Sequence, residues 1–319
     1  MQLGIVGLPN VGKSTLFNAL TAGHASVSAY PFCTINPNVG IVEVPDERLD
    51  RLFHIYKPQK LTPAIIKFID IAGLVKGASK GEGLGNQFLS HIREADGIIH
   101  IVRCFLKEGI THIDGSINPV RDIETIDIEL MLADLGTIDR ISSGLEKKAK
   151  SGGKQEKETL SKLTLIKESL EKGKPVRTLE VNTIYNPTDF LTAKPVLFVA
   201  NTGDPNEYTE AEMKKQEEFV SQVAQYATKE NAEVISISAQ LETEIVQLPA
   251  EEREKFRQEL GIDKSGLQKL IVAGYKLLDL VTFFTVVGNK EVRAWTVTNG
   301  TRAVDAAGKV HSDMKRGFI

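Results

Sequence analysis

The segment that decides the fold is Gly7-Leu8-Pro9-Asn10-Val11-Gly12-Lys13-Ser14-Thr15, which fits the pattern G-x-x-x-x-G-K-[ST] at every position. It follows a predicted strand at residues 3–6 and opens a predicted helix at residues 15–20, which is the context that the pattern requires. Glycines let backbone N–H groups surround phosphate oxygens, and the start of the helix adds positive potential. The segment therefore predicts a phosphate loop, whose nucleotide-binding residues are Asn10, Val11, Gly12, Lys13, Ser14 and Thr15.

Short apolar segments recur along the first 240 residues after this opening strand. They lie at residues 65–69, 98–102, 196–200 and 234–237. Each is followed by a loop rich in Gly, Asn, Asp or Ser, and most of these loops lead into a helical pattern. Strands that alternate with helices predict an α/β fold with a mostly parallel sheet, in which ligands bind at the carboxyl ends of the strands.

Polar residues after two of these segments indicate a Mg²⁺ site beside the phosphate loop. The Ser14 hydroxyl is the first predicted ligand, and Asp70, at the end of the 65–69 strand, is the second. Thr34 lies between them in the chain and is the third predicted ligand. The backbone N–H of Gly73 is predicted to contact the γ-phosphate, and Lys13 supplies a charge to the β- and γ-phosphates.

Two further loops lie where phosphate-loop GTPases contact the base. Asn201-Thr202-Gly203-Asp204 follows the strand at 196–200, and Ser238-Ala239-Gln240 follows the strand at 234–237. The predicted base-binding residues are Asn201, Asp204, Ser238, Ala239 and Gln240. The strand-end placement of all five elements, in this order along the chain, is a highly specific pattern.

The composition is typical of a soluble globular protein with about two domains. The chain has 319 residues, of which 41% are hydrophobic and 25% charged, and its net charge of −3 argues against a globally basic nucleic-acid binder. No apolar run approaches the roughly 20 residues that span a bilayer, so no membrane partner is expected. The only cysteines, Cys33 and Cys104, favour a reducing cytoplasm over a disulfide framework or a cysteine-based zinc site.

A helical region interrupts the alternating pattern between the 98–102 and 196–200 strands. Apolar residues at helical spacing predict two antiparallel helices joined by a loop at residues 150–154. Residues 142–177 contain 10 Lys and Arg against 5 Asp and Glu, a net charge of +5, so the rest of the chain carries −8. This hairpin is either a solvated arm, since lysine-rich helix faces are common, or a basic arm that contacts RNA.

With these residues in view, the chain resembles the Obg-like ATPase (YchF) family of phosphate-loop GTPases. The resemblance rests on the phosphate loop, on Tyr30-Pro31-Phe32-Cys33-Thr34-Ile35 and on the segments 70–79 and 81–86, which resemble the family's two switch regions. It spans essentially the whole chain. It implies a ribosome-associated, nucleotide-hydrolysing switch protein with slow intrinsic turnover, which binds ATP or GTP with Mg²⁺.

The resemblance also implies the domain organisation. A nucleotide-binding G domain would comprise residues 1–120 and 190–280, the inserted helical hairpin residues 121–189, and a partial β-grasp-like TGS domain residues 281–319. The two predicted strands at 282–287 and 292–297, followed by helical spacing at 301–309, fit the start of such a domain. The chain is expected to be a cytoplasmic monomer that binds ribosomal RNA through the hairpin and the TGS domain.

The base-reading loop departs from the N-K-x-D pattern of guanine-specific proteins. In that pattern the carboxylate accepts hydrogen bonds from guanine N1 and N2, and the lysine stem covers the base. Here Thr202 replaces the lysine, whereas Asp204 keeps the carboxylate. The resemblance favours ATP, and the retained Asp204 leaves GTP open.

The residue that positions the attacking water is not fixed by the sequence. Leu74 follows Gly73 and cannot hydrogen-bond water, unlike the glutamine of Ras-like enzymes. Two catalytic candidates follow from the resemblance. Asn10 occupies the place at which related enzymes bind K⁺, and His112 resembles a histidine proposed as catalytic, although a lone histidine is more often structural.

Three alternatives to an ATP-hydrolysing switch stay open. The first is a GTP-specific translation or ribosome-assembly GTPase. The second is an RNA-binding factor in which the nucleotide is structural. The third is a small-molecule kinase, against which the base-reading loops at 201–204 and 238–240 argue.

Overall fold

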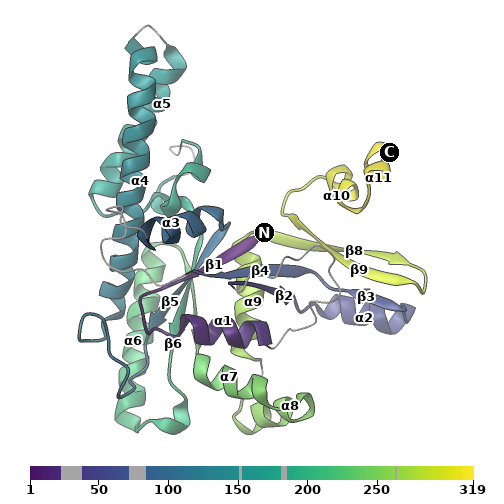
Figure 1. The fold of residues 1–319 in the computed structure, drawn as a ribbon. Coiled ribbons are helices and arrows are strands. Elements are labelled where there is room, and N and C mark those ends of the chain that lie inside the picture. Colours follow the sequence, from purple (N-terminus) through teal and green to yellow (C-terminus); the bar gives the residue numbers. More distant parts are fainter. Residues whose placement is uncertain (23–37, 72–83, 151–152, 181–184, 263) are drawn as a thin grey trace.

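The computed structural model describes residues 1–22, 38–71, 84–150, 153–180, 185–262 and 264–319 (Figure 1). Three parts are visible: a central sheet wrapped by helices, a long helical hairpin and a small second sheet near the C-terminus. Of the helices in these described ranges, none has the length and apolar character needed to cross a membrane.

The central sheet has six strands in the order β2-β4-β1-β5-β6-β7. Their bounds are Gln2–Val6 for β1, Val39–Glu43 for β2, Ile65–Asp70 for β4, Gly97–Arg103 for β5, Val196–Asn201 for β6 and Glu233–Ile237 for β7. All neighbours are parallel except β2 and β4. The α/β class with a mostly parallel sheet is thereby confirmed, and five of the six strands lie where the apolar segments predicted them.

The strand that the sequence did not predict is β2, at the edge of the sheet. In β2 the buried positions alternate with half-buried ones, and one of the two buried positions is Gly40. A side chain at Gly40 would meet Phe17 and Thr21 of α1 (Lys13–Ala22). The strand therefore lacks one of the apolar residues from which its pattern could be recognised.

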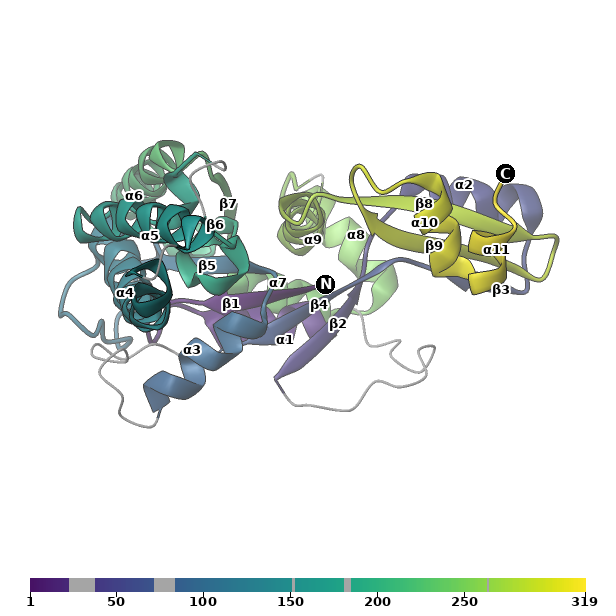
Figure 2. The same cartoon turned by 90° about the horizontal axis from the view of Figure 1, so that it is seen from above.

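Helices cover both faces of this sheet, and β5 and β6 are buried along their whole length (Figure 2). The covering helices include α1, α3 (Leu84–Glu94), α6 (Glu210–Lys229) and α9 (Gly266–Leu277). At the periphery, α7 (Ala239–Gln247) packs against α1, and α8 (Ala250–Glu259) follows α7. Short 3-10 turns lie at Val176–Thr178 (η3), Pro187–Asp189 (η5), Leu191–Ala193 (η6) and Pro205–Glu207 (η7). Burial on both faces explains why these strands read as continuous apolar runs.

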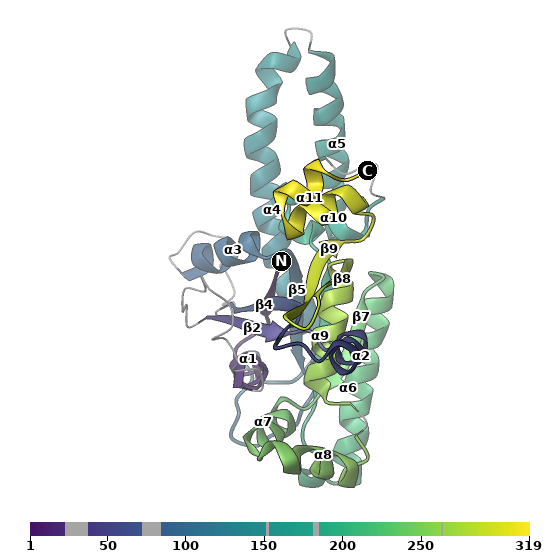
Figure 3. The same ribbon diagram turned by 90° about the vertical axis from the view of Figure 1, so that its right-hand side faces the viewer.

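The hairpin consists of α4 (Pro119–Lys150) and α5 (Lys154–Glu171), which run side by side away from the sheet (Figure 3). Its lower half has a small apolar core of its own, formed by Met131, Ile138, Leu163, Ile166, Leu170, Val176 and Phe190. The hairpin enters the chain between β5 and β6, as the sequence predicted.

The second sheet has the order β3-β9-β8. Its strands are β3 (Lys60–Thr62), β8 (Leu280–Val287) and β9 (Glu291–Thr298), and its helices are α2 (Glu47–Tyr56), α10 (Ala303–Val310) and α11 (Ser312–Arg316). The antiparallel pair β8-β9 matches the predicted hairpin. The parallel partner of β9 is β3, which lies within residues 1–120, the segment that the sequence assigned to the nucleotide-binding domain. The sequence did not predict β3, because three residues give no recognisable strand pattern.

Candidate nucleotide-binding site

The loop between β1 and α1 has the backbone of a phosphate-binding turn. Asn10 and Gly12 both have positive φ, at 63° and 95°. A Cβ atom on Gly12 would collide with Nδ2 of Asn201, so a side chain is excluded here by space as well as by conformation. The turn ends at Lys13, where α1 begins, so the first N–H groups of the helix face the loop.

Asn201, at the end of β6, connects three parts of the site. Its buried side chain donates from Nδ2 to the carbonyl of Val11 at 2.8 Å and accepts at Oδ1 from the backbone N–H of Ala239 at 3.0 Å. These bonds fasten the phosphate loop to the start of α7. The sequence predicted Asn201 as a base-binding residue, and the structure shows that its carboxamide ties the loops together.

Lys13 is buried at the centre of the phosphate loop. Its Nζ donates to the carbonyl of Leu8 at 2.7 Å, which places the charge at the concave side of the turn. Burial lowers the pKa of Lys13 to about 8, and the opposing attraction of Asp70 limits the shift. The ammonium group is therefore held where phosphate oxygens would contact it.

Ser14 and Asp70 lie together, as their predicted role as Mg²⁺ ligands requires. Ser14 Oγ donates to Asp70 Oδ2 at 3.1 Å. The other carboxylate oxygen, Oδ1, is buried and has no hydrogen-bond partner among the residues that the structure describes. A hydroxyl beside a carboxylate with an unpaired buried oxygen is a donor set suited to a hard cation. Thr34 and Gly73, the other predicted contacts, lie outside the described residues.

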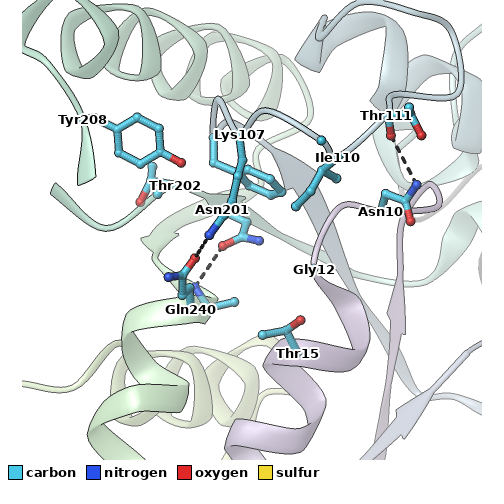
Figure 4. A pocket seen from close by; sticks show the side chains of 14 residues that line it. Asn10, Gly12, Thr15, Lys107, Ile110, Thr111, Asn201, Thr202, Tyr208 and Gln240 are labelled. Carbon is cyan, nitrogen blue, oxygen red and sulfur yellow. Dashed lines mark hydrogen bonds between the residues drawn. The ribbon is translucent and has the colours of Figure 1, made fainter. Parts of the chain in front are cut away.

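A cavity of about 450 Å³ opens beside the phosphate loop at the carboxyl ends of β5, β6 and β7 (Figure 4). Six predicted residues line it: Asn10, Gly12, Thr15, Asn201, Ala239 and Gln240. Further lining comes from Thr202, Gly203 and Tyr208 after β6 and, after β5, from five residues of the segment 105–111: Phe105, Lys107, Gly109, Ile110 and Thr111. The 105–111 segment escaped the sequence analysis because it fits no motif, although its place after a buried strand was a signal.

Two of the predicted base-binding residues do not line this cavity. Asp204 is buried, and its Oδ1 accepts from the N–H of Asn206 at 2.9 Å, so the carboxylate caps η7. Ser238 caps α7 by accepting from the N–H of Leu241 at 3.2 Å. Both side chains therefore stabilise the local backbone in this structure.

His112 points toward the start of α4. Its Nε2 lies 2.8 Å from Asp122 Oδ2, both side chains are less than 5% exposed, and Nδ1 accepts from the N–H of Asp114 at 3.1 Å. The preceding residue, Thr111, accepts at its carbonyl from Asn10 Nδ2 at 3.2 Å. His112 thus anchors a segment that contacts the phosphate loop.

The side chains of His112, Asp114 and Asp122 are close enough together to hold a metal ion. Arg121, however, lies among them, 3.5 Å from Asp114 and 3.1 Å from Asp122. Its guanidinium supplies the positive charge that a metal ion would bring, so this group fits an ion-pair cluster better than a metal centre.

Comparisons with known proteins agree with this geometry. A family model described as a 50S ribosome-binding GTPase matches residues 2–134, and a model for a YchF GTPase C-terminal region, described as a protein of unknown function (DUF933), matches residues 280–319. The ribosome-binding ATPase YchF of Bacillus subtilis is 51% identical over 323 residues, covering 100% of this chain and 87% of the relative. Its counterpart in Escherichia coli O157:H7 is 48% identical, with 100% and 86% covered.

A solved structure supports the same relationship. The YchF GTPase of Schizosaccharomyces pombe superimposes with a TM-score of 0.84 at 36% sequence identity, covering 100% of this chain and 86% of that chain.

Proposed function

Since the chain belongs to the YchF family, we propose that it is a ribosome-associated switch protein that binds and hydrolyses ATP with Mg²⁺. The observation that best supports the proposal is that the phosphate loop and the cavity beside it form one continuous site. Lys13, Ser14 and Asp70 form a triphosphate end, and the cavity beside them offers room for a nucleoside. The fold positions both ends at the carboxyl edge of one sheet.

ATP is favoured over GTP by the two positions that depart from guanine recognition. Thr202 lines the cavity but has no stem to cover a base, and Asp204 caps η7 instead of lining the cavity. A guanine would then lack the carboxylate that pairs with its N1–H and N2–H groups. The relatives carry both descriptions, ATPase for the bacterial proteins and GTPase for the fission-yeast structure, so GTP is the alternative to test.

Mg²⁺ would be held by Ser14 and Asp70, with Thr34 as a third ligand by sequence. The buried Oδ1 of Asp70, which has no hydrogen-bond partner within the described ranges, supports this assignment. The ion, when bound, would neutralise charge on the β- and γ-phosphates. Lys13 would exchange the Leu8 carbonyl for phosphate oxygens, and the backbone around Gly12 would orient them.

We propose different catalytic roles for Asn10 and His112. Asn10 contributes its carboxamide at the edge of the cavity, where a K⁺ ion would be bound beside the phosphates. His112 is paired with Asp122 and does not line the cavity, so a part in hydrolysis through the positioning of Thr111 and Asn10 fits its contacts better than direct contact with water.

The proposed partner is the ribosome, as the printed names of the relatives say of those proteins. Support in this chain is the segment 142–177, which carries a net charge of +5 and includes the tip of the projecting hairpin. We propose that this arm and the C-terminal sheet contact ribosomal RNA, that the protein acts as a monomer and that it works in the cytoplasm. We also propose the domain boundaries that the sequence indicates, with residues 1–120 and 190–280 as the nucleotide-binding domain.

The function is tested by titrating ATP and GTP side by side, with and without K⁺, and by measuring phosphate release. We expect tighter binding of ATP than of GTP, slow turnover, and faster turnover with K⁺ than with Na⁺. Tighter binding of GTP would favour the GTP-specific alternative. Nucleotide binding without any hydrolysis, in the presence and absence of ribosomes, would favour an RNA-binding factor with a structural nucleotide.

A further inference from the structure

Lys107 spans the part of the cavity in which the nucleobase would bind. Its side chain runs from the loop after β5 to the start of α7, where Nζ donates to Gln240 Oε1 at 2.7 Å (Figure 4). The carboxylate of Glu207, on η7, lies 3.5 Å from the same Nζ and accepts from Gln240 Nε2 at 2.9 Å. These three residues join the loops that follow β5, β6 and β7, and the aliphatic stem of Lys107 lies along the cavity wall.

Arg103 holds the backbone around Lys107 through hydrogen bonds to carbonyl groups. This side chain is 2% exposed, donates from Nε to the Phe105 carbonyl at 3.3 Å, and places its guanidinium 4.4 Å from the centre of the Phe105 ring. Its second contact, from a terminal nitrogen to the carbonyl of Lys107, is 3.5 Å long. A buried arginine that contacts the carbonyls of Phe105 and Lys107 holds the backbone from which the Lys107 side chain extends.

The wall of the cavity lacks a long side chain at position 202. Thr202 follows Asn201 and occupies the position at which the N-K-x-D pattern has a lysine whose stem covers the base. The ring of Tyr208 fills the space beside Gly203, since a Cβ atom on Gly203 would collide with that ring. Thr202, Tyr208 and the Lys107 stem thus line the same cavity, and a base bound there would have the stem within its reach.

We propose that the stem of Lys107 covers the purine of the bound nucleotide and so replaces the lysine that Thr202 has displaced. The contacts of Nζ with Gln240 and Glu207 hold the stem extended, and the methylene groups supply apolar contact to the base. This inference rests on the proposed function and adds to it a residue that binds the base.

The test is calorimetric titration of the whole chain with Mg²⁺ and three ligands: ATP, ADP and inorganic tripolyphosphate. Lys107→Ala removes the stem, so ATP and ADP should bind about five- to tenfold more weakly, whereas tripolyphosphate, which has no base, should bind unchanged. Lys107→Met keeps a stem without the charge and should bind ATP within about threefold of the parent. Lys255→Ala on α8, an exposed lysine outside the cavity, is the control.

A rescue experiment separates base covering from support of the loop. Adding Thr202→Lys to Lys107→Ala supplies a stem at the position where the N-K-x-D pattern has its lysine, so most of the lost nucleotide affinity should return. Nucleotide affinity of Lys107→Ala equal to or greater than that of the parent would overturn the inference, as would an equal loss for tripolyphosphate or a failure of rescue. A parent chain that binds tripolyphosphate but neither nucleotide would refute the proposed function itself.

Discussion

Lys13 shows how the fold sets the chemistry of one side chain. The lysine is needed as a cation, yet it is 8% exposed and its pKa is lowered to about 8 by burial. Phosphate oxygens beside Nζ would favour the charged form and raise this pKa in the complex. Nucleotide binding and protonation of Lys13 are therefore coupled.

We expect the affinity for ATP to depend on pH with a defined sign. Below the pKa of about 8, Lys13 is already protonated in the free protein, so affinity should be independent of its titration. Above it, binding must take up a proton, so affinity should fall by up to about tenfold per pH unit until the higher pKa of the complex is reached. Titrations between about pH 7 and pH 9.5, in two buffers of different ionisation enthalpy, measure this uptake.

Lys13→Arg is the matched control because arginine stays charged throughout this range. Its affinity can be lower overall, but the decline above pH 8 should be absent. A parent and an arginine variant with the same pH profile would show that another group controls the dependence.

The role of a single residue could be predicted from the sequence where a motif fixes the local geometry. The phosphate loop is such a case, since its spacing dictates the turn and places Lys13 and Ser14. Asp204 is a contrasting case: its position in the chain suggested a base contact, but a short carboxylate at the start of a turn readily caps that turn. Lys107 fits no pattern, because its role depends on how far a flexible side chain reaches across a cavity.

A buried ionic cluster joins the base of the hairpin to the C-terminal end of α6. Arg177, on η3, contacts Asp127 of α4 and Glu230, just after α6, each at 2.8 Å, and Tyr226 of α6 donates to Asp127 at 3.1 Å. Each of the three charged side chains is at most 7% exposed. The cluster therefore fixes the position of the projecting hairpin relative to α6, a helix that covers β6 and β7.

Arg177→Met should destabilise the fold by about 3–5 kcal/mol, because it leaves two buried carboxylates without a cation. Urea unfolding measures the loss. The control is the triple variant Arg177→Met/Asp127→Asn/Glu230→Gln, which removes all charges together and should recover a substantial part of the stability. A single variant within about 1 kcal/mol of the parent would mean that water reaches the carboxylates and replaces the guanidinium.

The elements that the sequence did not predict share a physical cause. β2 has a glycine at an inward position, and β3 is three residues long, so neither has the apolar pattern of a strand. Their pairing with β4 and β9 is decided by contacts far along the chain. The long hairpin helices, by contrast, repeat their apolar spacing over many turns, and the sequence located them.

In the whole molecule, the basic segment of the hairpin and the nucleotide cavity lie in different places. Residues 142–177 carry +5 on a chain whose remainder carries −8, and this basic segment includes the tip of the hairpin, which projects from the sheet (Figures 1 and 3). The nucleotide cavity lies at the carboxyl ends of the central strands, outside the apolar core of the hairpin. A partner can then be attracted by the arm without altering the phosphate site directly.

Reversing two exposed lysines of the first turns of α5, with Lys154→Glu/Lys157→Glu, should weaken association with ribosomes and leave ATP affinity unchanged. Each phosphate contact that is lost should reduce the slope of log affinity against log salt by about one, because fewer counterions are released on binding. Co-sedimentation at several salt concentrations measures both quantities. The matched control, Lys214→Glu/Lys255→Glu, makes the same charge change on α6 and α8. If both pairs weaken binding equally, net charge alone attracts the ribosome; if neither does, the hairpin is a solvated arm.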